Sequence, residues 1–154
     1  MPRRLELIVT YAARRPWVPP RAAFLRWATA ALAGAPGRAA HSVLSIRVVG
    51  AARSRTLNAR YRRRDRPTNV LSFEGAGTIP DGRLFVGELV ICAPVVAREA
   101  KMQGKMAEAH WAHITIHGVL HLLGHDHEHS AEARKMAAKE IQILDRLGFS
   151  DPYA

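Results

Sequence analysis

Residues 117–127 read HGVLHLLGHDH and place three histidines in the spacing H-x3-H-x5-H. Residues four apart lie on one face of an α-helix, about 40° apart around its axis, so His117 and His121 can face one metal ion. Gly124 can take the left-handed conformation that ends a helix, and the turn after it would bring His127 back toward the first two histidines. Three histidines leave one tetrahedral position open, which is typical of a catalytic zinc site rather than a structural one.

The same spacing occurs in the zinc-peptidase pattern H-E-x-x-H-x-x-G-x-x-H, with one difference. Gly118 stands where that pattern has the glutamate that acts as general base. The alternative explanation of the stretch is a run of core or surface histidines. Seven of the eight histidines, however, fall between positions 110 and 129, and three of them have a known ligand spacing around a glycine. These two features favour a metal site.

Two more histidines, His110 and His113, share the predicted helix face with His117 and His121. They lie farther back along the helix axis, too far to bind the same ion. We predict that they pack or form hydrogen bonds, and at most support a ligand from behind.

Three stretches together resemble the YbeY family of metal-dependent endoribonucleases. One is the histidine stretch with the residues before it, 109–127, and another is GELVIC at 87–92. The third combines Leu57-Asn58, Tyr61-Arg62 and DRPTNVLSF at 65–73. The resemblance runs from about residue 43 to the C-terminus and includes LGF at 147–149 and DPY at 151–153. His125 stands where the family often has tyrosine.

The resemblance implies an activity, a cofactor and partners. It implies a zinc-dependent endoribonuclease for single-stranded RNA, with one Zn²⁺ per chain. It also implies a part in maturing ribosomal RNA, especially the 3′ end of the small-subunit RNA, and in ribosome quality control, with the ribosome or its proteins as partners. Arg62 matches the family's functional arginine and is the predicted catalytic residue. A planar guanidinium near the metal would suit a phosphodiester, because it pairs with two phosphate oxygens and stabilises developing negative charge.

The net charge of +10 favours a polyanionic partner, either nucleic acid or an anionic membrane surface. A general bias of the composition toward arginine is the alternative explanation. The arginines are concentrated between residues 53 and 66, where Asp65 is the only acidic residue. A solvated surface normally mixes charges of both signs, so we predict phosphate contacts there. The predicted substrate-binding residues are Arg63, Arg64 and Arg66.

A chain of 154 residues has the length of a single domain, so residues 1–154 are predicted to form one catalytic domain. Its one cysteine, Cys92, excludes an internal disulfide, suits the reducing cytoplasm and is predicted to be a small buried residue. No apolar run approaches the roughly 20 residues that span a bilayer, and no signal peptide is readable. We therefore expect a cytoplasmic protein that is not bound to a membrane.

Hydrophobic periodicity, together with glycine and proline positions, predicts alternating strands and helices. Gly87 is a candidate bulge, Ser130 a candidate N-cap, and 75–82 a surface loop. The predicted strands are 5–10, 42–49, 70–73 and 84–92, and the predicted helices are 21–33, 51–61, 94–103, 105–123 and 131–147. Strands and helices interleave imperfectly, which predicts an α+β domain. The resemblance implies the same arrangement: one small mixed sheet of about four strands with five or six helices, and the metal site on a helix and the turn after it.

Two other functions remain open at the level of sequence. One is a metal-dependent peptidase, which Gly118 disfavours because the adjacent glutamate is missing. The other is an RNA-binding ribosome assembly factor with a structural metal, which an open three-histidine site disfavours. The attacking group also stays open. It is either a zinc-bound water, whose pKa falls toward 7, or the 2′-hydroxyl of RNA, and no general base is identified.

Overall fold

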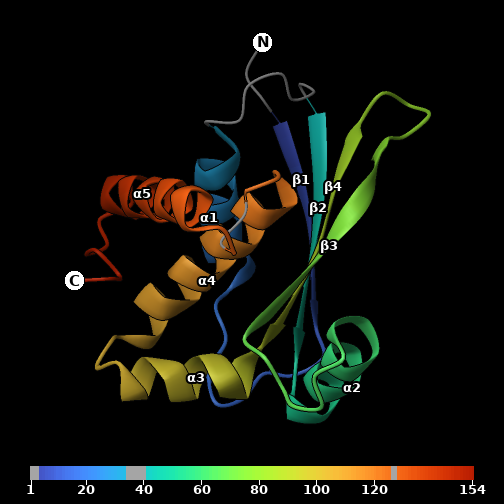
Figure 1. The fold of residues 1–154 in the computed structure, drawn as a ribbon. Helices are drawn as coiled ribbons and strands as arrows, with labels where there is room; N and C mark the ends of the chain where they lie inside the picture. The colour runs from blue at the N-terminus through green and yellow to red at the C-terminus, as the bar shows by residue number, and fades with distance from the viewer. Residues whose placement is uncertain (1–3, 34–40, 126–127) are drawn as a thin grey trace.

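The fold is built on a four-stranded mixed β-sheet (Figure 1). The structure is a computed structural model that describes residues 4–33, 41–125 and 128–154. Its strand order is β1-β2-β4-β3, in which the first three strands run parallel and β3 is antiparallel to β4. The strands are β1 (Arg4–Tyr11), β2 (His41–Val49), β3 (Val70–Thr78) and β4 (Leu84–Cys92). The predicted α+β fold with one small mixed sheet is confirmed.

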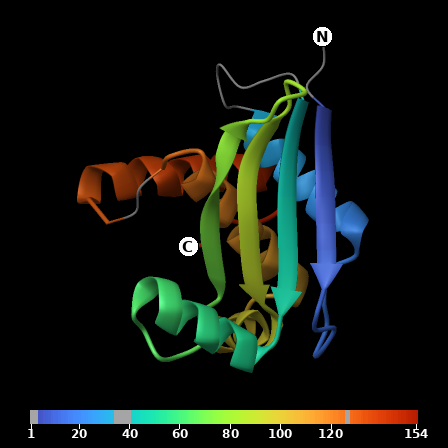
Figure 2. The same cartoon turned by 90° about the vertical axis from the view of Figure 1, so that its right-hand side faces the viewer.

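The described residues contain five helices, which lie unequally on the two faces of the sheet (Figures 1 and 2). Helices α1 and α4 pack on one face, and α5 packs over α4. Helix α2 lies at the other face, near the end where β2 and β4 finish (Figure 2). The helices are α1 (Arg21–Ala33), α2 (Ala51–Arg62), α3 (Ala93–Met102), α4 (Ala107–Leu122) and α5 (Ser130–Arg146).

The main hydrophobic core fills the space between the sheet, α1 and α4. In β2, Leu44, Ile46 and Val48 point into this core, because alternate residues of a strand face the same side. The rings of Trp27 and Trp111 meet Phe24 edge to face, with centroids 5.8 and 5.9 Å away. Trp27 is fully buried.

A smaller apolar cluster lies on the opposite face of the sheet, beneath α2. Cys92 belongs to it and is buried, as predicted. The cluster attaches α2 to the sheet, so the segment after α2 starts from a fixed point. Its buried members are Val49, Leu71, Val90, Cys92 and Val95.

Two local predictions are wrong. The predicted loop at 75–82 is partly strand, because β3 continues to Thr78 and pairs with β4 as a hairpin in which Thr78 lies opposite Leu84. Ser130 is not the N-cap of α5. The helix begins one residue earlier, because the Ala133 amide bonds to the His129 carbonyl. His129 is the N-cap residue, and its side chain does not form the capping bond to the helix amides.

The predicted bulge is present, since the β2–β4 register shifts next to Gly87, which pairs with Leu44. No helix in the described part of the chain has both the length and the apolar character needed to cross a membrane.

Candidate metal and RNA site

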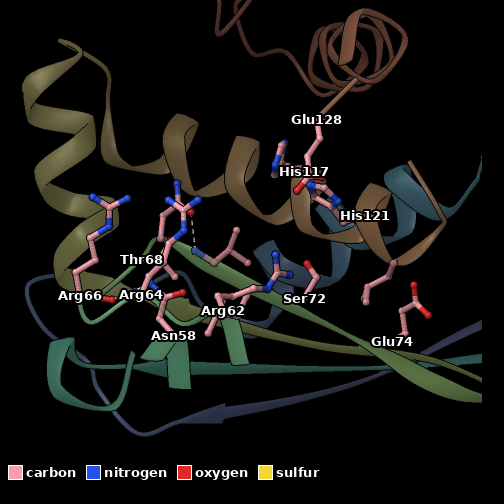
Figure 3. A pocket seen from close by; sticks show the side chains of 14 residues that line it. Asn58, Arg62, Arg64, Arg66, Thr68, Ser72, Glu74, His117, His121 and Glu128 are labelled. Carbon is pink, nitrogen blue, oxygen red and sulfur yellow. Dashed lines mark hydrogen bonds between the residues drawn. The ribbon is translucent and has the colours of Figure 1, made fainter. Parts of the chain in front are cut away.

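A pocket of about 380 Å³ lies between α4 and the segment that connects α2 to β3 (Figure 3). The lining side chains are mostly polar, and they come from parts of the chain that are far apart in sequence. Those labelled in Figure 3 are Asn58, Arg62, Arg64, Arg66, Thr68, Ser72, Glu74, His117, His121 and Glu128. The pocket therefore combines two sets of residues that the sequence singled out separately, histidines and arginines.

His117 and His121 point from α4 into this pocket (Figure 3). Their ring centroids are 4.8 Å apart, with an interplanar angle of 76°. The four-residue spacing thus places both rings on one face of the helix, as predicted. Neutral imidazole nitrogens are common zinc ligands, so the donor chemistry of this pair fits a zinc ion.

Helix α4 approaches the sheet closely at Gly118. A β-carbon at Gly118 would lie 2.8 Å from Leu89 Cδ2 and 3.3 Å from Val70 Cγ2. The Ser72 hydroxyl donates a hydrogen bond of 3.1 Å to the Gly118 carbonyl. The position of the peptidase glutamate is therefore in contact with the sheet, and a side chain there would point toward Leu89 rather than into the pocket.

The end of α4 has the hydrogen bonds of a Schellman motif. The Gly124 amide bonds to the His121 carbonyl and the His125 amide to the Leu120 carbonyl, both at 3.0 Å. Gly124 has φ of +96°, a conformation that side chains with a β-carbon rarely adopt. After this turn the chain comes back to the pocket, as shown by Glu128, which lines the same pocket as His121 (Figure 3).

The predicted third ligand, His127, lies outside the described residues. The turn that should direct it is present, and the residue immediately after it reaches the pocket. The complete ligand set of His117, His121 and His127 thus stays a prediction.

Behind His117 lies a buried carboxylate, Glu140 of α5, which is 1% exposed. His117 Nδ1 lies 2.8 Å and His113 Nε2 3.0 Å from Glu140 Oε1. The Tyr153 hydroxyl donates to Oε2 at 2.7 Å. Burial raises the pKa of Glu140, but the hydrogen bonds from His113, His117 and Tyr153 outweigh it and bring the pKa to about 2. Burial and the bond to Glu140 raise the pKa of Tyr153.

Two overlapping groups of side chains in the described residues can thus be considered for a metal. One is the pair His117 and His121 in the pocket. The other is His113, His117 and Glu140, whose potential ligand atoms lie within 4.8 Å of one another. A group of residues that can hold a metal is therefore present, and His117 belongs to both sets.

The other two histidines of the α4 face are buried and hydrogen-bonded, as predicted. His113 contacts Glu140, and His110 Nε2 lies 2.9 Å from Glu99 Oε1. Glu99 also accepts hydrogen bonds of 3.1 and 3.3 Å from the Asn69 amide. Burial raises the pKa of Glu99, but the bonds from His110 and Asn69 give a net lowering. This contact fixes the start of β3 against α3 and α4.

The arginines of the cluster differ in position. Arg62, Arg64 and Arg66 line the pocket, whereas Arg63 is not among its lining residues, although all four are exposed. Arg63 ends α2 in a left-handed conformation with φ of +57°, which turns the chain between its two neighbours. Arg55 is bonded to Asp65 by two contacts of 2.8 and 3.0 Å.

Two buried polar residues of α2 hold the arginine-bearing segment. Ser54 Oγ accepts from the Thr68 amide at 2.9 Å and donates to the Thr68 carbonyl at 3.0 Å. The Asn58 amide donates to the Arg66 carbonyl at 2.8 Å. These bonds satisfy backbone groups of a segment without regular structure, and so they fix the direction in which Arg64 and Arg66 leave it.

Sequence reasoning assigned no role to Glu140, Tyr153, Ser72 or Glu128. Ser72 and Tyr153 lie in the stretches quoted for the family resemblance, so a signal for them existed. Glu140 is 23 residues from His117 on another helix, and no local pattern connects the two. Glu128 directly follows the histidine stretch, and only the direction of the turn would identify it as a residue of the pocket.

Comparison with known proteins shows similarity over nearly the whole chain. The sequence model of a family described as Endoribonuclease YbeY matches residues 21–148. A protein named Endoribonuclease YbeY from Stenotrophomonas maltophilia (strain K279a) is 51% identical over 157 residues, covering 99% of this chain and 96% of its own. A second protein of that name, from Alkalilimnicola ehrlichii, is 53% identical over 152 residues, covering 97% of this chain and 91% of its own.

Among solved structures, the solution structure of TM1509 from Thermotoga maritima is similar to this one. The TM-score is 0.57 at 19% sequence identity, over 93% of this chain and 92% of the other. This likeness concerns the fold alone.

Proposed function

Because the chain belongs to the endoribonuclease YbeY family, we propose that it is a zinc-dependent endoribonuclease that cleaves single-stranded RNA in the pocket between α4 and the α2–β3 segment. Family membership makes it a nuclease, a hydrolase of phosphodiester bonds. The finer parts of the proposal are the zinc ion, the residues that hold it and the arginines that hold RNA.

The observation that carries the proposal is the meeting of arginines and histidines in one pocket. Arg62, Arg64 and Arg66 lie across the pocket from His117 and His121 (Figure 3). A phosphodiester in this space would face cationic forks on one side and metal-binding imidazoles on the other. Affinity for the RNA backbone and the reactive centre would thus coincide.

We assign His117, His121 and His127 as the residues that would hold one zinc ion. When bound, zinc supplies Lewis-acid chemistry at a phosphoryl oxygen. Arg62, the last residue of α2, is the proposed catalytic residue, and its planar guanidinium would stabilise the charge that develops on the phosphate. Arg64 and Arg66, with Arg63 outside the pocket, would bind the flanking phosphates.

The packing of Gly118 disfavours the peptidase alternative. In the zinc peptidases the general-base glutamate stands at the position of Gly118. In this protein the sheet packs against Gly118 and leaves little room for a side chain. The remaining alternative is an RNA-binding assembly factor with a structural metal. The two histidines line an accessible pocket together with arginines. This arrangement favours a metal that contacts bound RNA over a metal that only stabilises the fold.

The family further supports a cellular role. We propose maturation of ribosomal RNA, especially the 3′ end of the small-subunit RNA, together with ribosome quality control in the cytoplasm. Partners would be ribosomal RNA and the ribosome or its proteins. Cells lacking the protein should accumulate small-subunit RNA with extended 3′ ends, and the wild type but not His121→Ala should restore normal ends.

The direct test combines metal analysis with cleavage of a defined RNA, offered single-stranded and as a duplex. The wild type should hold about one zinc per chain, because the three proposed histidines form one ligand set, and it should cleave only the single strand. His121→Ala should lose both properties. The control is His41→Ala, at an exposed position at the start of β2. Normal zinc content and cleavage in His121→Ala would overturn the proposed site.

A further inference from the structure

Glu140 is set apart from the other carboxylates of the described chain by its burial and its partners. The side chain is 1% exposed and accepts hydrogen bonds from two histidines and a tyrosine. His113 and His117 are presented by α4, Glu140 by α5 and Tyr153 by the C-terminal segment. A buried charge is costly unless it is fully paired, and here both oxygens are engaged.

The contact with His117 determines which edge of that ring meets the pocket. An ionised carboxylate only accepts hydrogen bonds, so Nδ1 of His117 must carry the proton. In a neutral imidazole the lone pair then belongs to Nε2, on the other edge of the ring. His117 lines the pocket beside His121 (Figure 3), so Nε2 is the nitrogen presented to a metal there.

The alternative is that Glu140 is itself a ligand, together with His113 and His117. Tetrahedral zinc bonds of about 2.0–2.1 Å keep ligand atoms roughly 3.3 Å apart. Glu140 Oε1 lies 2.8 Å from His117 Nδ1 and 3.0 Å from His113 Nε2, which are hydrogen-bond lengths. The second oxygen is held by Tyr153. The distances therefore favour a hydrogen-bonded network over a ligand set.

We propose that Glu140 is a positioning residue of the metal site, which holds His117 with Nε2 directed at the metal. His113 and Tyr153 hold Glu140 in turn, so that α5 and the C-terminal segment determine the orientation of a ligand on α4. The inference rests on the proposed function, because it takes His117 and His121 as ligands of the metal.

The test measures zinc affinity by competition with a chelator, with zinc alone as the ligand, in folded variants. Loss of a residue that orients a ligand typically weakens metal binding by 10- to 100-fold, so we expect that range, about 10–100, for Glu140→Met. Glu140→Gln keeps an acceptor oxygen without the charge and should fall between Glu140→Met and the wild type. Zinc affinity equal to wild type in folded Glu140→Gln and Glu140→Met would overturn the proposal. If Glu140→Met does not fold, zinc affinity equal to wild type in Glu140→Gln alone would overturn the proposal.

Two further variants separate positioning from ligation. Under the proposal, His121→Ala abolishes tight zinc binding, while His113→Phe, which removes only a partner of Glu140, changes the affinity by a few-fold at most. If His113, His117 and Glu140 were the ligands, His113→Phe would abolish binding and His121→Ala would not, and the proposal would fail. Cobalt substitution supports the comparison, because the visible spectrum of Co²⁺ changes with its ligands.

RNA cleavage by the wild type is measured separately and distinguishes the two proposals. Normal zinc affinity without cleavage would overturn the proposed nuclease activity and leave the role of Glu140 intact. Cleavage by the wild type, combined with unchanged zinc affinity in Glu140→Gln, would overturn the role of Glu140 and leave the nuclease intact.

Discussion

At the scale of single residues, the proposed chemistry depends on two side chains and one backbone conformation. Arg62 is the proposed catalytic group, and His117 is the histidine whose orientation is fixed from behind. Gly124 contributes its backbone conformation, and among the described residues no atom lies within 4 Å of a β-carbon placed there.

We expect Gly124→Ala to weaken zinc binding although residue 124 has no metal-binding atom. The positive φ costs a residue with a β-carbon roughly 1 kcal/mol, which corresponds to at most about a fivefold loss of affinity. The control is Gly104→Ala, which carries the same kind of strain at the end of α3, away from the pocket. It should lose similar thermal stability and no zinc affinity. Equal zinc affinities of Gly124→Ala and the wild type would contradict the proposed role of the turn.

Arg62→Lys should keep most RNA binding and lose most cleavage. Lysine retains the charge but not the rigid fork that can hold two phosphate oxygens. Removing such a transition-state contact typically slows the chemical step by about a hundredfold or more. Single-turnover cleavage of a short single-stranded RNA at saturating enzyme measures this, with zinc content checked. Arg60→Lys on the exposed side of α2 is the control. Near-normal cleavage by Arg62→Lys would reduce Arg62 to an ordinary phosphate contact.

At the scale of elements, the decisive relation is between α2 and the segment after it. The helix presents Ser54, which is 2% exposed, to the backbone of Thr68 in two reciprocal hydrogen bonds. Together with Asn58, this contact makes an irregular segment into a fixed support for the arginines.

Ser54→Ala should therefore lower stability and RNA affinity together, with zinc affinity unchanged. The Thr68 amide and carbonyl lose their partner, which costs about 1–3 kcal/mol if they stay buried. Thermal unfolding, RNA titration and chelator competition give the three readouts. Thr56→Ala is the matched control, because the Thr56 hydroxyl donates a hydrogen bond within its own helix, to the Ala52 carbonyl. RNA affinity as high in Ser54→Ala as in Thr56→Ala would show that the arginines do not need this support.

At the scale of the whole molecule, the surplus of positive charge is unevenly distributed. The arginines of the pocket face the histidine side of α4, whereas Arg55 is neutralised by Asp65 on the outer side of α2. RNA affinity should therefore depend mainly on the few arginines that line the pocket, rather than on the net charge of +10 alone.

The salt dependence of RNA binding tests this distribution. For a single strand, each phosphate contact contributes about 0.7 log units of affinity per tenfold change in salt. The triple variant of Arg63, Arg64 and Arg66 to alanine should flatten the slope, and we expect Arg64 and Arg66 to account for most of the change. Arg53→Ala, at an exposed position outside the pocket, removes one charge as a control. An unchanged slope in the triple variant would mean that the cluster reflects compositional bias only.

The sequence alone determined the local features of this protein. The α4 spacing placed His117 and His121 on one face, and Gly124 was identified as the turn, because helical periodicity and backbone sterics act between near neighbours. Apolar patterning also gave the strands and helices to within a few residues, except where β3 extends through hairpin pairing to Thr78.

Only the tertiary structure decided which residues, distant in sequence, come into contact with each local feature. That Arg62, Arg64 and Arg66 face the histidines, while Arg63 does not, depends on how α2 and its following segment are held. The contact between Glu140 and His117 joins two helices, and no residue pattern carries it. The physical reason is range. Hydrogen bonds and ion pairs act over a few ångströms in space, and residues distant in sequence come within that reach only when helices pack on the sheet and on one another.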